Sequence, residues 1–485
     1  MSNKDTAAQP RRTKIVATVG PACQRREALD ELVKAGVDVF RLNFSHGTHD
    51  EHAKALTNAR EAADEAGRSV AIMQDLQGPR LRTGPLKDPG GVELKQGDAL
   101  TIIPGEFEGA ADTISTTYEQ LPRDVASGQS ILLGDGMIEL DVEDVSDDEV
   151  HCRVRFGGTL GEHEGMNLPG VKLSITSPTD KDLRDLQFAV EHNVDYIALS
   201  FVQSPDDIRR LKAEIDDRGT DIPVIAKIEK PEALEQLDEV LRAADGAMVA
   251  RGDLGIEMQT EAVPPAQKRI IRRANTWGKP VITATQMLES MMQHPRPTRA
   301  EASDVANAIL DGTDAAMLSG ETAVGRYPRL VVETMRRVAE QAEGLLRDES
   351  FAAQPPEPVP DNPRETCLAM AARDAAERLD AAGIVAFTMT GATARHVSQQ
   401  RPDMPIYALS PSESTCRRLA LVWGVRPVQL PVYSTTDEMI RRGDDRLQEM
   451  GLVEAGETIV CMAGGSTGTR GGTDMLKIHA IGEAN

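Results

Sequence analysis

The sequence predicts an α/β protein: a (β/α)8 barrel with a small β-barrel domain inserted after the third strand and an α/β domain at the C-terminal end. Three observations lead to this fold class. Eight short runs rich in Val, Ile and Ala alternate with amphipathic helical stretches. About a hundred residues separate the third run from the fourth, and a Pro-rich stretch follows the eighth unit.

The eight apolar runs have the length and composition of strands in a parallel sheet. They lie at residues 14–19, 37–43, 70–75, 196–201, 223–229, 246–252, 280–285 and 315–319. Most are apolar until their last residues, which is typical of strands buried on both faces. Apolar residues at three- and four-residue spacing predict helices over 30–34, 182–191, 206–215 and 232–241.

Connection length and composition divide the chain further. The gap after the third strand is far longer than an ordinary βα connection, and its Gly-rich turns and alternating segments predict a β domain. Residues 352–363 are too rich in Pro for a helix or a central strand, whereas strand-like segments at 383–388, 406–409 and 458–462 predict an α/β domain. We expect a disordered tail at 1–12, a catalytic barrel at 13–77 and 172–347, a lid domain at 78–171, a linker at 348–363 and a regulatory domain at 364–485.

Composition narrows the class of protein. A formal net charge of −23 disfavours nucleic acid as a partner, and no apolar run approaches the ~20 residues that cross a bilayer. The polar N-terminal stretch lacks an apolar signal core and the five cysteines show no paired spacing, so we expect a cytoplasmic protein with reduced thiols. Arg outnumbers Lys about three to one and aromatic residues are 3%, which favours a halophilic source over a merely acidic surface.

Polar side chains end nearly every predicted barrel strand. Because catalytic groups of such barrels stand at the carboxyl ends of the strands, we expect these side chains to gather at one mouth. They are Arg41, Asn43 and Ser45 on the second strand, Asp75 on the third, Lys227 and Glu229 on the fifth, Arg251 and Asp253 on the sixth, Thr283 and Thr285 on the seventh, and Ser319 and Glu321 on the eighth.

The fifth strand carries two charges on one face. Lys227 and Glu229 are two residues apart and so point to the same side, where a buried ion pair is one interpretation. In the other, Glu229 and Asp253 bind Mg²⁺ or Mn²⁺ and Lys227 faces a phosphoryl group. The glycines of Arg251-Gly-Asp-Leu-Gly255 free backbone N–H groups that suit an anion, although an ordinary strand-to-helix turn has the same pattern.

Seven segments, in order, resemble the signatures of the pyruvate kinase family along nearly the whole chain. They are Thr13-Lys-Ile-Val-Ala-Thr-Val-Gly-Pro21, Arg41-Leu-Asn-Phe-Ser-His-Gly47, Ile225-Ala-Lys-Ile-Glu229, Val249-Ala-Arg-Gly-Asp-Leu-Gly255, Ala284-Thr-Gln-Met-Leu-Glu-Ser290, Pro295-Arg-Pro-Thr-Arg-Ala-Glu301 and Met317-Leu-Ser-Gly-Glu-Thr322. The resemblance implies a glycolytic enzyme that moves the phosphoryl group of phosphoenolpyruvate to ADP and forms pyruvate and ATP. It also implies a homotetramer.

The resemblance also implies the role of each site residue. Arg41 and Lys227 would hold the transferring phosphoryl group, and Glu229 and Asp253 the divalent ion. The substrate carboxylate would contact Gly252, Asp253 and Thr285, while Thr285 and Ser319 would relay a proton to the enolate. Pro21, Asn43, His46 and Arg82 would line the ADP or ATP side, with Arg82 also catalytic.

The sequence departs from the family pattern in two places. Relatives that require potassium bind it with residues matching Asn43, Ser45, Asp75 and Leu76, and carry an acidic residue where Arg80 stands here. We therefore expect activity that needs no K⁺, with the Arg80 charge replacing the ion. In the lid, Glu164 stands where many relatives place a nucleotide-facing Lys, which leaves open what replaces that cation.

Two further motifs have weaker interpretations. The turns at Thr388, Thr390, Gly391 and Thr393 and at 464–472 are rich in Gly and hydroxyls, and in the family a phosphorylated effector binds in this region; plain turns are the alternative. No Walker lysine follows them. His46, His49 and His52 repeat every third residue, which fits an exposed helix start better than a zinc site.

Two other functions fit part of the pattern. A barrel lyase or aldolase that handles a pyruvate enolate would also use Glu229 and Asp253, but it gives no reason for Lys227 beside them or for the extra domains. A noncatalytic sensor of a phosphorylated metabolite would not need Arg41, Lys227 and Thr285 intact.

Overall fold

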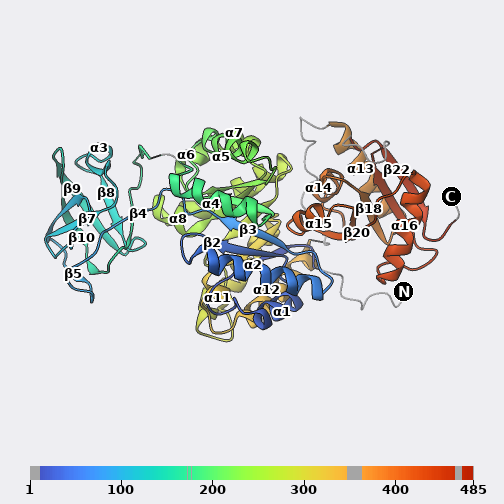
Figure 1. The fold of residues 1–485 in the computed structure, drawn as a ribbon, viewed down its shortest axis with the longest axis horizontal. Coiled ribbons are helices and arrows are strands. Elements are labelled where there is room, and N and C mark those ends of the chain that lie inside the picture. Colours follow the sequence, from blue (N-terminus) through green and yellow to red (C-terminus); the bar gives the residue numbers. More distant parts are fainter. Residues whose placement is uncertain (1–10, 172, 176, 347–362, 465–471, 484–485) are drawn as a thin grey trace.

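The computed structural model describes residues 11–171, 173–175, 177–346, 363–464 and 472–483. Three bodies follow one another along the long axis of the molecule (Figure 1). The inserted β domain lies at one end, the barrel in the middle and the C-terminal domain at the other end. The inserted domain therefore meets the barrel on the side opposite to the C-terminal domain.

The central body is a closed barrel of eight parallel strands, as the sequence predicts. Each of the eight apolar runs is a strand, one or two residues shorter than expected, because residues at the ends of the runs already belong to the loops. The strands are β1 (Lys14–Thr18), β2 (Val39–Asn43), β3 (Ala71–Asp75), β13 (Tyr196–Leu199), β14 (Val224–Ile228), β15 (Gly246–Ala250), β16 (Val281–Ala284) and β17 (Ala315–Leu318). Parallel pairing of β1 with both β2 and β17 closes the ring.

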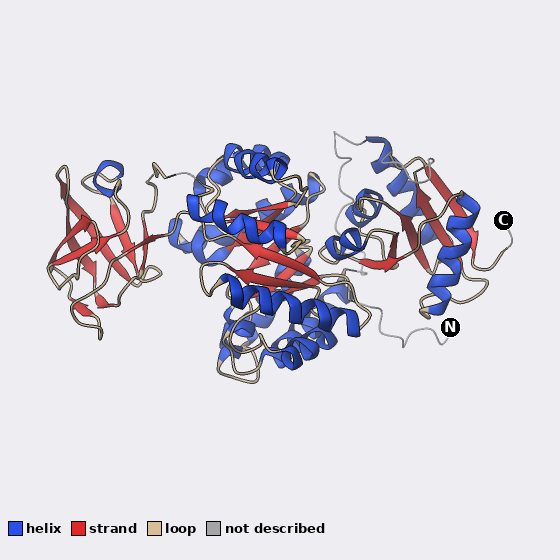
Figure 2. Cartoon of the chain, in the orientation of Figure 1, coloured by secondary structure: helices blue, strands red, loops and turns tan. Residues whose placement is uncertain are grey.

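Helices surround the barrel (Figure 2) and pack their apolar faces on the outside of the strands. They are α1 (Arg26–Ala35), α2 (His49–Glu65), α4 (Asp180–Glu191), α5 (Pro205–Asp217), α6 (Pro231–Glu235), α7 (Leu237–Ala243), α8 (Arg251–Glu257), α9 (Val263–Thr276), α10 (Arg299–Leu310), α11 (Gly320–Ala323) and α12 (Pro328–Leu345). Within the described residues no helix is long and apolar enough to cross a membrane.

One helix prediction was wrong. The stretch 232–241, expected as a single helix, is split into α6 and α7 because Gln236 leaves the helical region, with φ −108° and ψ 30°. The apolar spacing continues across the break, so both pieces still bury Leu234, Leu237 and Leu241 against the barrel. Burial periodicity alone therefore does not reveal the break.

The insertion after β3 is a β domain with its own core. Its main sheet has the order β4-β12-β8-β9-β10-β6-β7, and an antiparallel bridge from Thr83 to Thr116 links the two edge strands, so that the sheet curls on itself. A short helix, α3 (Leu121–Asp124), and a second sheet of β5 and β11 complete it. The strands are β4 (Leu81–Arg82), β5 (Val92–Leu94), β6 (Ala99–Pro104), β7 (Thr113–Thr116), β8 (Ser130–Leu133), β9 (Ile138–Val145), β10 (Val150–Phe156), β11 (Gly158–Leu160) and β12 (Gly165–Asn167).

The C-terminal body is an α/β domain with a five-stranded sheet of order β20-β19-β18-β21-β22. Its three predicted strands are β18 (Gly383–Phe387), β19 (Ile406–Ser410) and β21 (Thr458–Ala463), and its helices are α13 (Pro363–Arg378), α14 (Ala392–Gln399), α15 (Glu413–Leu419) and α16 (Thr436–Glu449). The edge strands β20 (Val425–Gln429) and β22 (Met475–Ala480) were not predicted. Most of the expected linker lies outside the described residues.

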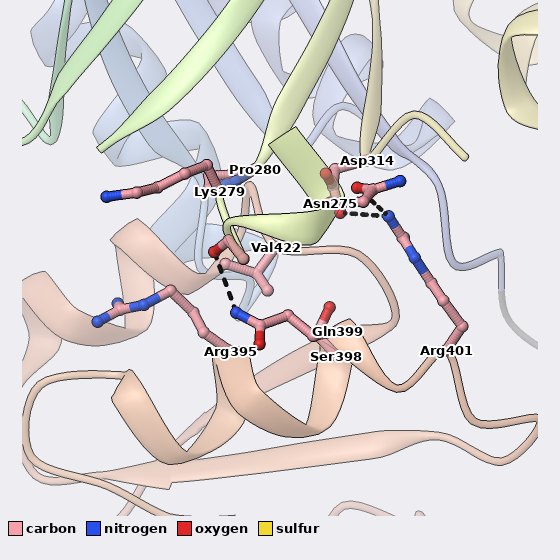
Figure 3. A pocket seen from close by; sticks show the side chains of 10 residues that line it. Asn275, Lys279, Pro280, Asp314, Arg395, Ser398, Gln399, Arg401 and Val422 are labelled. Atoms are coloured by element: carbon pink, nitrogen blue, oxygen red, sulfur yellow. Dashed lines mark hydrogen bonds and ion pairs between the residues drawn. The ribbon is translucent and has the colours of Figure 1, made fainter. Parts of the chain in front are cut away.

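The C-terminal domain fills the floor of the barrel. Ala420 and Leu421, just after α15, belong to the same buried cluster as the inward-facing side chains of the barrel strands, and Leu421 is fully buried. Figure 3 shows the neighbouring contacts: the Gln399 side chain donates to the Gly278 carbonyl at 3.1 Å, and Arg401 lies 3.1 Å from the Asp314 carboxylate. The two bodies thus share one interior and a polar rim.

Candidate active site

Lys227 stands at the centre of the open mouth, on β14. Its Nζ lies 2.6 Å from Ser200 Oγ, 2.9 Å from Glu229 Oε1 and 3.3 Å from Asp75 Oδ1. Burial lowers its pKa, but the carboxylates of Asp75 and Glu229 outweigh this and raise the pKa to about 12. The amine is therefore a fixed cation at the carboxyl ends of β3, β13 and β14.

Asp75 links this cation to a second one. Arg41 Nε lies 2.6 Å from Asp75 Oδ2, and the Arg41 guanidinium also donates to Thr18 Oγ1 at 3.1 Å. Asp75 is buried, which would raise the pKa of its carboxyl, but Lys227 and Arg41 lower it below the usual value. One carboxylate thus holds two cations of different strands toward the same space.

Both carboxylate oxygens of the fully buried Glu229 have one close contact each. Its Oε2 accepts the Phe201 N–H at 2.6 Å, and its Oε1 lies 2.9 Å from Lys227 Nζ. Burial raises the pKa of Glu229, Lys227 opposes that shift, and the Asp253 carboxylate adds to it. A carboxylate pair of this kind suits a cation, and the ion pair expected as the alternative is also present.

The donor set fits a hard divalent ion. Within the described part of the chain no three His, Cys, Asp or Glu side chains gather at a metal-sized site. Mg²⁺ commonly takes only one or two protein carboxylates and completes its shell with water and substrate oxygens. Glu229 Oε1 and the nearby Asp253 carboxylate would supply those ligands.

Gly252 and Thr285 form a second part of the mouth. Helix α8 starts directly after β15, and the Gly252 N–H donates to Thr285 Oγ1 at 2.8 Å, while that hydroxyl donates to the Ala284 carbonyl at 2.6 Å. Thr285 and Gln286 have φ of 67° and 53°. A β-branched residue rarely adopts this left-handed conformation, so the local structure must hold Thr285 there.

The Ser319 hydroxyl is buried and has no hydrogen-bond partner among the residues that the structure describes. Its Oγ makes no hydrogen bond, although its backbone N–H donates to Glu321 Oε2 at 2.7 Å. Glu321 is itself buried and accepts the Leu288 N–H at 3.1 Å through its other oxygen. The buried carboxylate therefore fixes the turn that carries Ser319.

The predicted nucleotide side is rich in cations. Burial lowers the pKa of His46, and the neighbouring charges of Arg80, Arg82 and Arg41 lower it further. Arg82, on the lid strand β4, donates to the His163 carbonyl at 2.7 Å. Pro21 lies exposed in the loop after β1. The charges of three arginines, from the barrel and the insertion, thus act on one imidazole.

The other two histidines point to separate partners. His52 stacks on Phe44 with ring centroids 4.3 Å apart, and its Nε2 pairs with the His46 carbonyl at 2.9 Å. His49 Nε2 lies 2.8 Å from the Asp185 carboxylate. The three-residue repeat thus packs one end of α2 against the barrel.

The residues that match the family's potassium ligands engage one another or nearby groups. Asn43 Oδ1 accepts the Ser45 N–H at 3.2 Å, and the Leu76 carbonyl accepts Ser200 Oγ–H at 2.6 Å. Asp75 is held by Arg41 and Lys227, as described above.

The lid contributes both signs of charge. Burial lowers the pKa of Arg82, Arg80 lowers it further, and the Glu164 charge opposes the shift. Glu164 precedes Gly165, which pairs with Arg82 in the sheet. The Glu164 N–H donates to Thr83 Oγ1 at 3.0 Å. A loosely paired Arg80 lies 3.9 Å from Asp135.

The predicted effector turn is preorganised by hydroxyls. Thr388 Oγ1 accepts the Gly391 N–H at 2.9 Å, and Gly391 has φ 84°, a conformation that favours glycine. Thr393 Oγ1 lies 2.8 Å from Thr473 Oγ1, and the Thr390 carbonyl accepts from Arg395 at 3.2 Å. Most of the second turn, 465–471, lies outside the described residues.

Sequence reasoning missed Ser200. It named no polar residue on the fourth strand, yet Ser200 follows β13 directly and makes the shortest contact to Lys227. The rule applied to the other strands, that the polar residue ending an apolar run faces the mouth, would have found it.

A barrel that fixes two cations, a carboxylate pair and a buried hydroxyl at the carboxyl ends of its strands has the features of a phosphotransferase, because phosphoryl transfer depends on positioned charge. Family models support this class. Residues 10–332 match the barrel domain of pyruvate kinase, and residues 366–479 match its alpha/beta domain. The chain belongs to the pyruvate kinase family.

Individual relatives agree over the full length. The chain is 47% identical over 479 residues to pyruvate kinase 2 of Synechocystis sp., covering 98% of this chain and 80% of that protein. It is 44% identical over 473 residues to the pyruvate kinase of Mycobacterium tuberculosis, covering 98% and 99%. A solved pyruvate kinase from Cryptosporidium parvum superposes with a TM-score of 0.89 at 38% identity, over 97% of this chain and 96% of that one.

Proposed function

We propose that the protein transfers the phosphoryl group of phosphoenolpyruvate to ADP and forms pyruvate and ATP, as a glycolytic enzyme of the cytoplasm. The observation that carries the proposal is the convergence of Lys227 and Arg41 on Asp75 at the mouth of the barrel. In this proposal residues 13–77 and 172–347 are the catalytic domain, 78–171 the lid and 364–485 the regulatory domain.

The two cations are suited to a phosphoryl group in flight. Each already faces an anionic oxygen, at 2.6 Å for Arg41 and 3.3 Å for Lys227, so a phosphoryl group can take over contacts now made by Asp75. Charge spreads over the phosphoryl oxygens in the transition state, and fixed cations stabilise it without reorganisation. Lys227 is assigned this role because its raised pKa keeps it charged.

Glu229 and Asp253 are assigned to Mg²⁺, or to Mn²⁺ in its place. A bound divalent ion neutralises developing charge and orients substrate oxygens. The support is the buried Glu229 carboxylate at the barrel mouth and its electrostatic interaction with Asp253. Burial already raises the pKa of Glu229, and an adjacent cation favours its charged form.

The substrate carboxylate is assigned to the start of α8, at the backbone N–H groups of Gly252 and Asp253, with the Thr285 hydroxyl beside them. Thr285 Oγ1 accepts from Gly252 and donates to Ala284, so its proton is already engaged. Ser319 Oγ–H makes no hydrogen bond. In a relay through both residues, Ser319 is therefore the better placed to pass a proton to the enolate carbon.

The ADP side is assigned to Pro21, Asn43, His46 and Arg82. Burial and the charges of Arg80, Arg82 and Arg41 disfavour protonation of His46, so the arginines supply the positive charge on this side. We assign Arg82 as the lid cation that stands in for the Lys replaced by Glu164, since Gly165, the residue after Glu164, pairs with Arg82 in the sheet.

The charge of Arg80 supports activity without K⁺. Its charge acts on His46, three residues after Asn43 in the loop that carries two of the four positions matching the potassium ligands. The acidic composition, with a net charge of −23, supports adaptation to high salt. A homotetramer, and a phosphorylated effector at the turn of Thr388, Thr390, Gly391 and Thr393, complete the proposal; hydroxyl groups line that turn.

The decisive experiment measures pyruvate and ATP formed from phosphoenolpyruvate and ADP with Mg²⁺, in high salt without K⁺. Lys227→Met should abolish turnover, while Lys268→Met, at a lysine 61% exposed on the outside of the barrel, should leave it unchanged. Absence of turnover by folded wild type, even after K⁺ and phosphorylated metabolites are added, would contradict the proposal and favour a sensor or lyase.

A further inference from the structure

The Arg251 side chain donates hydrogen bonds to the two backbone carbonyls that flank the strained Cα of Thr285. Its Nη2 donates to the Thr285 carbonyl at 2.6 Å, and its Nε donates to the Ala284 carbonyl at 3.2 Å. The next residue, Gly252, donates its N–H to the Thr285 hydroxyl. Residues 251 and 252 therefore fix Thr285 through two carbonyls and one hydroxyl.

The segment that Arg251 holds would not adopt this shape freely. Thr285 and Gln286 are consecutive non-glycine residues in the left-handed region, with φ of 67° and 53°. Such strain persists only where surrounding contacts over-determine the conformation. Gln286 is exposed, and its side chain makes no hydrogen bond within the described residues that could replace those contacts.

Asp304 anchors the guanidinium from the far side. Both of its carboxylate oxygens lie within 2.8 Å of Arg251 Nη1, and Asp304 belongs to α10, outside the catalytic mouth. The Arg251 side chain is 10% exposed and that of Asp304 39%, so the pair is partly shielded from water. Among cationic side chains, only the planar guanidinium with its several N–H donors can donate to a carboxylate and two carbonyls at once.

We propose that Arg251 is a positioning residue for the reaction, which holds the Thr285 turn in its left-handed conformation while Asp304 orients the guanidinium. The inference deepens the proposed function, because it rests on the assignment of Thr285 to the substrate carboxylate and the proton relay. Loss of these hydrogen bonds should let the turn leave the left-handed conformation and move the Thr285 hydroxyl away from Gly252. Substrate binding and protonation of the enolate should then suffer together.

The test compares wild type with Arg251→Lys and Asp304→Asn. Arg251→Lys keeps the positive charge but loses the planar set of N–H donors. We expect kcat to fall about tenfold or more, since small displacements of a reacting group lower the rate strongly. KM for phosphoenolpyruvate should rise, and the solvent deuterium isotope effect on kcat should increase because proton transfer becomes slower. Asp304→Asn should shift all three values in the same direction by less.

A rescue separates positioning from general stability. Glycine adopts positive φ freely, so Gln286→Gly in the Arg251→Lys background should restore most of the lost kcat and the original isotope effect. Arg273→Lys is the matched control: it changes an arginine whose Nε lies 2.7 Å from Asp238 on the outer helices, and kinetics should not change.

Each result decides the inference. Wild-type kinetics in both Arg251→Lys and Asp304→Asn would overturn it, and so would a loss of kcat with an unchanged isotope effect that Gln286→Gly does not restore. If Arg251→Lys does not fold, the same comparison is made with Asp304→Asn and its Gln286→Gly double variant. No turnover by wild type would instead contradict the proposed function.

Discussion

Lys227 and Asp75 face each other across the barrel mouth, with 3.3 Å between Nζ and Oδ1, and both side chains are almost completely buried. They come from strands separated by β13, and Ser200 at the end of that strand contacts both. A buried ion pair of this kind contributes little net stability, because desolvation offsets most of its attraction. Its presence at the mouth is better explained by function.

Asp75→Asn should destabilise the protein and impair catalysis together. The substitution leaves Arg41 and Lys227 facing each other without their shared anion, and breaking a buried pair typically costs about 3–5 kcal/mol. Urea unfolding would measure the loss, with Asp206→Asn as control, since the Asp206 carboxylate is 75% exposed. Equal midpoints for the two variants would contradict the buried-pair argument.

Glu229 should make stability depend on pH in a predictable direction. Because its folded-state pKa is raised above 4.5, the native protein binds a proton more tightly than the unfolded chain. The stabilising contribution is full below pH 4.5 and is lost as pH rises through the raised folded pKa. In a chelator, the stability of wild type relative to Glu229→Gln should fall over that window. A difference that is constant with pH would be inconsistent with a raised pKa.

Ser319→Ala should lower kcat without lowering stability. The buried Oγ makes no hydrogen bond within the described residues, so its removal leaves no partner unsatisfied. Loss of a group in proton transfer typically costs about a hundredfold or more in rate. Thermal unfolding and steady-state kinetics on the same preparation check both parts, and a stability loss with normal kcat would reverse the assignment.

Arg80→Glu should create a requirement for K⁺. The substitution replaces a fixed cation near His46 with an anion, which an added monovalent cation can neutralise. Activity would be measured in KCl and in tetramethylammonium chloride at equal ionic strength, so that salt needed for folding is held constant. If wild type and variant respond alike to K⁺, Arg80 does not replace the ion.

Leu421→Ala should destabilise the barrel although Leu421 belongs to the C-terminal domain. The side chain is fully buried in the interior cluster of the barrel, where Leu→Ala substitutions cost about 2–5 kcal/mol. Leu345→Ala, at a residue 46% exposed on α12, is the control and should cost much less. Denaturation of both variants, followed by circular dichroism, measures the difference.

The barrel could be predicted because parallel strands buried on both faces appear in the sequence as uninterrupted apolar runs. Strands β20 and β22 were missed because each is an edge strand: Pro427 interrupts the first, and exposed or half-buried residues dominate the second. The break at Gln236 was missed because the apolar spacing continues through it.

The charged residues at the centre of the site could also be predicted from the strand ends, as Lys227, Glu229 and Asp75 show. The hydrogen bonds of Arg251 to the Thr285 turn could not be predicted. The sequence reveals neither the positive φ of Thr285 nor the contact of Arg251 with Asp304 on a distant helix. Local sequence gives the chemistry available at each position. Backbone strain and its supporting contacts depend on the assembled fold.

The position of Leu421 has a consequence for how the chain is made. A ribosome releases the segment that carries Ala420 and Leu421 long after the eighth barrel strand has emerged. Until then the inner face of the strands lacks the side chains that complete it, and the nascent barrel exposes an apolar opening. Domains usually fold in order during synthesis. Here the barrel is synthesised first, but its interior is complete only after the segment of the C-terminal domain has emerged. We therefore expect termination before Ala420 to leave a barrel with an incomplete interior rather than a shorter enzyme.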